Sequence, residues 1–175
     1  MSELRTCSSI WSLAFNAVIF IAVSATGAAS AAPASLATYV NERFGYSVAY
    51  PQNTFLPQPE AGNGDGREFR ARNGKAQFLV WASYNVLEET PAGYASEAEA
   101  KCIDHVAPYK VVRPTMVVVS CETADGIEYA KRLIVGDVLT NFVMSYPKAE
   151  RTRWDPVVAA ISRSLVGASG WEPVH

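Results

Sequence analysis

Alternating hydrophobic and polar positions predict a β-hairpin near the middle of the chain. The segments 67–71 and 75–84 flank Asn73-Gly74, and an Asn-Gly pair supplies the positive φ angles of a tight hairpin turn. The second arm, AQFLVWASY, is apolar at nearly every position, so we expect a central strand that is covered on both faces. Upstream, residues 46–50 alternate large and small side chains and predict a short, half-buried strand that ends at Pro51.

Four further stretches rich in β-branched residues follow later in the chain. They occupy residues 109–112, 116–122, 127–135 and 138–146. Short turns containing Gly, Pro or Asp separate them, and such short connections join antiparallel neighbours. Residues 51–66 are rich in Pro, Gly, Asn and Gln instead. We expect a sixteen-residue loop there, a length that is often functional.

Two segments carry the signals of α-helices. Ser-Glu-Ala-Glu at 96–99 has the form of a capping box, and it predicts a helix that starts there and ends near residue 107, before Pro108. In the second segment, Asp155 is a good N-cap residue and Pro156 suits the first helical position. Gly167 suits the end of that helix. Its apolar stripe consists of Val157, Val158, Ile161 and Leu165.

The order of these elements predicts an α+β fold, with an antiparallel sheet of about six or seven strands and two main helices packed on it. Residues 39–165 resemble small exported proteins of unknown function from α-proteobacteria, through NERFGYSVAYP, GNGDGREF and AQFLVWASYN. The final RWDPVVAAISRSL, after a run of strands, is similar in layout to the PsbP/Mog1-like α/β/α sandwich. That resemblance implies a binding role, because members of the group mostly bind partners, and it supplies no catalytic residues.

The N-terminal segment has the order of a secretory signal. A polar start containing Arg5 precedes the apolar run LAFNAVIFIAV at 13–23, and small residues follow. Ala29-Ser30-Ala31 is an A-x-A site, so we expect cleavage after Ala31, with Ala28 and Ala34 as alternatives. The alternative is an uncleaved anchor, but the apolar run is shorter than the roughly 20 residues of a membrane-spanning helix. The mature protein would be periplasmic or secreted and would keep no membrane span. The predicted division is a signal at 1–31, a lead-in segment at 32–45, one α+β domain at 46–167 and a loose tail at 168–175.

Composition and charge narrow the classes of partner. The chain has 175 residues, of which 49% are hydrophobic, so it can bury a sizeable core. Its 15 Lys and Arg residues against 17 Asp and Glu residues give a net charge of −2. That balance provides no broad basic field, so we expect no nucleic-acid partner.

The cysteines predict one disulfide. Cys7 lies in the signal, and Cys102 and Cys121 remain as a pair in an oxidising compartment. Two alternatives use the same sulfur atoms. Cys102, His105 and Cys121 provide three zinc-ligand side chains but no evident fourth, and an unpaired thiolate beside His105 would form a nucleophilic dyad. We expect the disulfide, with no cofactor, metal or catalytic residue.

Candidate binding residues lie around the predicted hairpin. Asp65 and Arg67 follow a glycine-rich stretch that is succeeded by a strand, whereas a phosphate-binding loop requires a helix there. Trp81, Tyr84 and Asn85 close the apolar strand, and aromatic side chains exposed at such a position anchor interfaces. The sequence therefore favours an exported, non-enzymatic binding protein for an unknown envelope protein or ligand.

An enzymatic alternative remains open at this point. Two carboxylates, Asp65 with Glu68 or Glu88, would suit an exported hydrolase acting on an envelope polymer, if a cleft holds them within about 10 Å. The sequence gives little support for histidine-dependent catalysis, because His105 and His175 are its only histidines.

Overall fold

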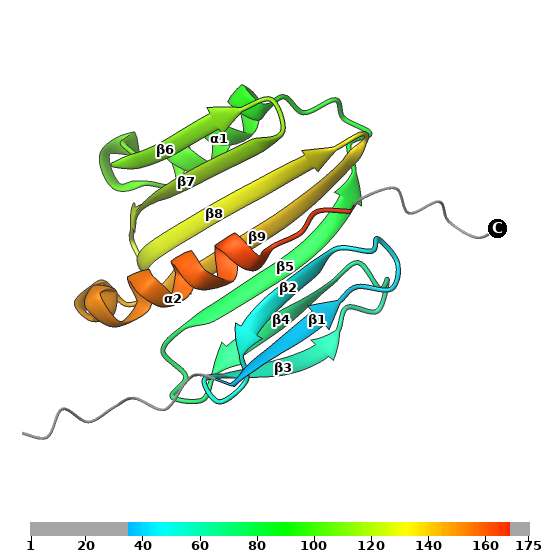
Figure 1. Cartoon of the computed structure of the whole chain (residues 1–175). Coiled ribbons are helices and arrows are strands. Elements are labelled where there is room, and N and C mark those ends of the chain that lie inside the picture. Colours follow the sequence, from blue (N-terminus) through cyan, green and yellow to red (C-terminus); the bar gives the residue numbers. More distant parts are fainter. Residues whose placement is uncertain (1–34, 169–175) are drawn as a thin grey trace, which may run out of the picture. The chain divides into compact units, whose positions relative to one another are not determined.

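The computed structural model describes residues 35–168, which contain nine strands and two α-helices (Figure 1). The strands are β1 (Leu36–Val40), β2 (Ser47–Pro51), β3 (Phe55–Glu60), β4 (Gly66–Ala71), β5 (Gln77–Tyr84), β6 (Tyr109–Arg113), β7 (Met116–Thr123), β8 (Gly126–Val135) and β9 (Val138–Tyr146). The helices are α1 (Pro91–Ala100) and α2 (Arg151–Ser164), with 3-10 turns η1 (Ile103–His105) and η2 (Lys148–Glu150). The predicted signal at 1–31 and nearly all of the predicted tail lie outside the described residues.

Seven strands form one antiparallel sheet in the order β3-β4-β5-β9-β8-β7-β6, and β1 pairs with β2 separately. The predicted α+β fold is confirmed. The hairpin between β4 and β5 is also confirmed, but of the Asn-Gly pair only Gly74 has a positive φ, +69°, and the connection spans residues 72–76. The four predicted strands after residue 108 form the antiparallel series β6 to β9. No helix among residues 35–168 is long and apolar enough to cross a membrane.

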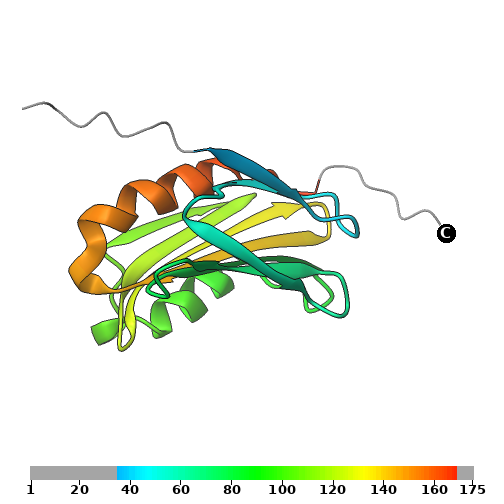
Figure 2. The same cartoon turned by 90° about the horizontal axis from the view of Figure 1, so that it is seen from below.

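One face of the sheet is covered by α2 together with the β1–β2 hairpin (Figure 2). The large core lies in this layer, where the rings of Phe69 and Phe78 stack with their centroids 4.4 Å apart. Trp154 of α2 is fully buried and packs 5.8 Å from Phe55 of β3. The hairpin is tied to the helix end because Ala49 N–H donates to Ser164 Oγ over 2.9 Å.

α1 lies on the opposite face and contacts β6 and β7 (Figure 2). A smaller core forms beneath it, and the predicted disulfide between Cys102 and Cys121 is confirmed, with Cα atoms 5.6 Å apart. The bond joins the segment after α1 to β7 and consumes both sulfur atoms. The zinc site and the Cys–His dyad, which needed free thiolates, are therefore not the arrangement found here.

The prediction of a sixteen-residue loop at 51–66 is wrong, because β3 occupies its centre. Pro57 and Pro59 argued against a strand, but β3 is an edge strand, where a missing N–H on the outer side costs no ladder hydrogen bond. The predicted lead-in segment at 32–45 contains β1, which pairs with β2 along its whole length.

The predicted start of the first helix at Ser96 is also wrong. α1 begins at Pro91, where Thr90 Oγ1 accepts the N–H of Gly93 over 3.0 Å, so the Thr-Pro pair supplies the N-cap and Ser96 lies inside the helix. The helix ends at Ala100 and not near residue 107, since the backbone is already extended at Cys102, with a ψ of 148°.

The second helix starts earlier than predicted. α2 begins at Arg151 after Glu150, so Asp155 is not its N-cap and Pro156 lies inside the helix. The early start places Trp154 in the core, and its Nε1 donates to Glu150 over 3.0 Å. This burial offsets the backbone hydrogen bond that Pro156 removes. The helix ends at Ser164, before the predicted Gly167.

Candidate functional site

Half of the sheet face that carries α1 has no helix on it. The prediction that β5 is covered on both faces is wrong, because only alternate residues of this strand are buried. Leu79 is 41% exposed, whereas its neighbour Phe78 is 1% exposed. We call this surface the open face. Its residues are Glu68 and Arg70 of β4, Leu79 and Trp81 of β5, and Val143 of β9.

A depression of about 310 Å³ lies at the β4 side of the open face. It is lined by Pro59, Ala61, Asp65, Gly66, Arg67, Glu68, Leu79 and Trp81. The structure thus brings together three of the five binding candidates from the sequence, Asp65, Arg67 and Trp81. Gly66 permits the close strand contact here, because a Cβ at this position would lie 2.5 Å from the Cβ of Trp81.

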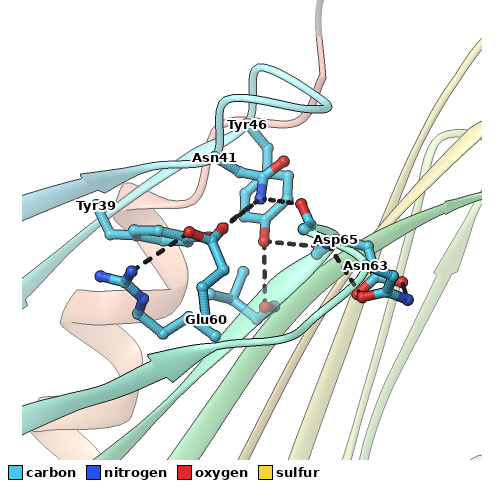
Figure 3. Close-up of polar contacts among 9 residues, drawn as sticks. Tyr39, Asn41, Tyr46, Glu60, Asn63 and Asp65 are labelled. Carbon is cyan, nitrogen blue, oxygen red and sulfur yellow. Dashed lines mark hydrogen bonds and ion pairs between the residues drawn. The ribbon is translucent and has the colours of Figure 1, made fainter.

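A buried asparagine supports the loop that carries Asp65 (Figure 3). Asn41 is fully buried, and its Nδ2 donates to Gly64 O over 2.9 Å and to Glu60 Oε1 over 3.1 Å. Its Oδ1 accepts the N–H of Phe44 over 2.8 Å. Tyr39 OH donates to the same Glu60 oxygen over 2.6 Å. Asn41 therefore locks the turn after β3 onto the β1–β2 hairpin.

Tyr46, the residue just before β2, also supports this loop. Its hydroxyl lies 3.1 Å from Asp65 O and 3.2 Å from Val80 O, and it donates to these carbonyls. Burial raises the pKa of Tyr46 far above its ordinary value, so the hydroxyl keeps its proton. Sequence reasoning missed this support. Asn41 and Tyr46 lie within the NERFGYSVAYP string. Their hydrogen-bond partners lie 19 to 34 residues away, so nothing in the local sequence indicated these contacts.

The charges around the depression are not equally available. Arg67 forms an ion pair with Glu60 at 3.3 Å, and its guanidinium lies 5.0 Å from the ring centre of Tyr39. The carboxylate of Asp65 accepts a hydrogen bond from Asn63 Nδ2 and forms no ion pair with any of residues 35–168. Asp65 therefore contributes the uncompensated negative charge at this site.

Of the two predicted carboxylate pairs, only Asp65 with Glu68 lies at the depression. Glu68 lines the same depression as Asp65, and both of its oxygens accept from Arg70, over 2.8 and 2.9 Å. Glu88 does not line the depression and lies in the loop after β5.

Tyr84 and Asn85 are separate from the depression. The ring of Tyr84 packs 5.4 Å from that of Phe44 and is 43% exposed. The side chain of Asn85 accepts the N–H of Glu89 over 2.8 Å and donates to its carbonyl over 3.1 Å. These contacts show that Asn85 shapes its own loop.

A second polar cluster, which sequence reasoning also missed, lies between the open face and α1. Arg132 of β8 is 8% exposed, and its guanidinium stacks 3.7 Å from the ring centre of Tyr94. Its Nε donates to Asn141 Oδ1 over 2.6 Å, and its Nη1 pairs with Glu89. Asn141 in turn pairs with Trp81 across β9 and β5. The cluster holds α1 and the loop before it against the strands of the open face.

No family model and no curated protein sequence matches this chain. Among solved structures, the solution structure of cyanobacterial PsbP (CyanoP) from Synechocystis sp. PCC 6803 superposes with a TM-score of 0.58 and 15% identity, over 79% of this chain and 95% of that chain. The two proteins share a fold, which agrees with the PsbP-like layout expected from the element order. A crystal structure at 1.50 Å from Bacteroides thetaiotaomicron VPI-5482 has a TM-score of 0.45 and 13% identity, over 77% of this chain and 49% of that chain.

Proposed function

We propose that the chain is an exported, non-enzymatic binding protein whose open face holds a basic segment of an envelope protein. The observation that carries this proposal is the exposed Leu79 and the half-buried Trp81, which line one depression with the uncompensated carboxylate of Asp65. Apolar side chains grouped on a sheet face and rimmed by charge are typical of interaction sites. The secretory pattern of residues 1–31 and the disulfide support an oxidising compartment outside the cytoplasm.

The lining of the depression favours a cationic side chain in the partner. An indole ring attracts a Lys or Arg head group through its π face, and Asp65 supplies the opposite charge. The two arginines of β4 do not oppose this preference, because Arg67 pairs with Glu60 and Arg70 pairs with Glu68. The aliphatic stem of the same Lys or Arg would lie along Leu79.

The contacts of Glu68 with Arg70 favour binding over hydrolysis. A carboxylate hydrolase needs one carboxyl to give a proton and a second to act as base or nucleophile. Asp65 and Glu68 line one depression, but the bidentate contact with Arg70 occupies both oxygens of Glu68.

The test is a cross-linking pull-down from envelope extract with a chain that begins at Ala32 and contains all of the described core. The variant combines Asp65→Asn with Trp81→Ala, leaving Arg67 in place because it holds Glu60. A matched control combines Asp125→Asn with Val135→Ala, a carboxylate and an apolar side chain at exposed positions outside the depression.

We expect one protein to be captured by the wild type and by the control, to be lost with the variant, and to be released by raised salt. Circular dichroism of all three chains checks that they are folded. Equal capture by the variant and the wild type would refute the open face as the binding surface.

A further inference from the structure

The seven-stranded sheet has two edges that differ in their ability to pair with another strand. β3 contains Pro57 and Pro59, and its pairing with β4 shifts register between Pro57 and Glu60. Prolines and bulges of this kind block edge-to-edge pairing. β6 has no proline and no register shift, and all five of its residues pair with β7.

Exposed apolar side chains lie along the β6 edge. They are Ile103 (47% exposed), Val106 (62%), Tyr109 (53%) and Val112 (45%). Ile103, Val106 and Tyr109 also line a cavity of about 560 Å³ that reaches Cys121. The disulfide fixes the segment that leads into β6 against β7, so this edge is held in place before any partner arrives.

We propose that β6 pairs antiparallel with β6 of a second copy of this chain, extending the sheet across a twofold axis at Val111. The sequence of the strand is self-complementary in this register. Val111 faces Val111 of the second copy, and Tyr109 faces Arg113 of the second copy at both ends. An aromatic ring directly opposite a guanidinium is a favourable cross-strand pair. This register pairs all five residues of the strand, and a shift in either direction pairs fewer.

Charge does not oppose the pairing. Lys110 would lie near Lys110 of the second copy, but each Lys110 forms an ion pair with Glu99 of its own α1 at 2.7 Å. A foreign strand would also find the free edge of β6, but the matching of Tyr109 with Arg113 favours an identical chain.

Space does not oppose it either. Neighbouring strands are about 4.8 Å apart, so β7 and β7 of the second copy would be separated by about 14 Å. The two copies of α1, which lie chiefly over β7, need only about 8–10 Å between their axes.

The first test measures mass by sedimentation equilibrium with the chain from Ala32 over a range of concentrations. Val112→Lys places a lysine opposite Lys110 of the second copy at an exposed position. We expect it to raise the dimer dissociation constant by about tenfold or more. Leu56→Lys is the matched control on β3, where Leu56 is 41% exposed, and it should leave the constant unchanged.

The second test fixes the register. The chain from Ala32 lacks Cys7, so an added cysteine is its one free thiol beside the disulfide. Val111→Cys should form a cross-linked dimer under mild oxidation, because the two copies of residue 111 face each other. Arg113→Cys should not, because its counterpart lies four positions away along the paired strands.

A wild type that stays monomeric throughout the concentration range would overturn the proposal and leave the β6 edge to a foreign strand. A dimer that Val112→Lys does not weaken, or equal cross-linking at positions 111 and 113, would also overturn it. None of these outcomes depends on the open face, so the proposed function stands or fails separately.

Discussion

The two faces of the seven-stranded sheet are stabilised in different ways. Beneath α2 and the β1–β2 hairpin lies a cluster of 20 buried residues, ten of them aromatic. Beneath α1 lies a cluster of seven buried residues with one aromatic ring, that of Tyr94. The first face has the larger apolar cluster, whereas the second adds a disulfide and the Arg132 cluster. The smaller core also leaves β4, β5 and β9 uncovered, which provides the open face.

The largest expected effect contrasts two neighbouring residues of β5 that point to opposite faces. Phe78→Ala removes a ring stacked on Phe69 and should lower the free energy of unfolding by about 3–5 kcal/mol. Leu79→Ala, on the open face, should lower it by less than about 1 kcal/mol. Urea unfolding of both variants measures the difference. Similar losses would mean that the open face is buried in solution.

Removing the disulfide should affect the α1 face more than the α2 face. Cys102→Ser with Cys121→Ser removes a crosslink between two residues that are 19 positions apart in the sequence. We expect the free energy of unfolding to fall by on the order of 3 kcal/mol. Hydrogen exchange should show α1 losing protection while α2 keeps it. Equal loss in both helices would show that the two cores unfold as one unit.

Alkaline pH should destabilise the protein through its buried tyrosines. Burial raises the pKa of Tyr94 to about 12, while Arg132 opposes the shift. Between pH 10 and 12 the unfolded chain therefore releases this proton and the folded chain keeps it, so the free energy of unfolding falls as pH rises, on the order of 2 kcal/mol from Tyr94. Tyr94→Phe should lessen the fall between pH 9 and 12 when unfolding is followed in urea. An unchanged fall would place Tyr94 in contact with solvent.

The smallest effect concerns a buried charge on the α2 face. Lys131 is 8% exposed, its Nζ donates to Ser162 O over 2.6 Å, and burial lowers its pKa. Lys131→Met should raise the free energy of unfolding by up to about 1 kcal/mol at neutral pH. This gain should shrink as pH rises towards 10.5, because the folded wild type then loses its buried charge before the unfolded chain does. A destabilised variant would show that the Ser162 contact outweighs the cost of burial.

Much of the fold was predictable because its signals are local. Asn73-Gly74 set the hairpin turn, short connections set the antiparallel order of β6 to β9, and the pair of cysteines set the disulfide. The site was only partly predictable. Of the five candidates, Asp65, Arg67 and Trp81 lie together at the depression, whereas Tyr84 and Asn85 lie apart from it. Asn41 was missed because its partners lie about 20 residues away.

The sequence by itself determined where turns occur, which segments are extended and how the two later cysteines pair, since these depend on φ preferences, side-chain periodicity and counting. The tertiary structure decided that a segment with two prolines becomes an edge strand, that α2 begins early enough to bury Trp154, and that Arg132 is buried against Tyr94. It also decided which half of the sheet stays open. Each of these outcomes depends on the free energy of contacts between residues far apart in the chain, which no local pattern records.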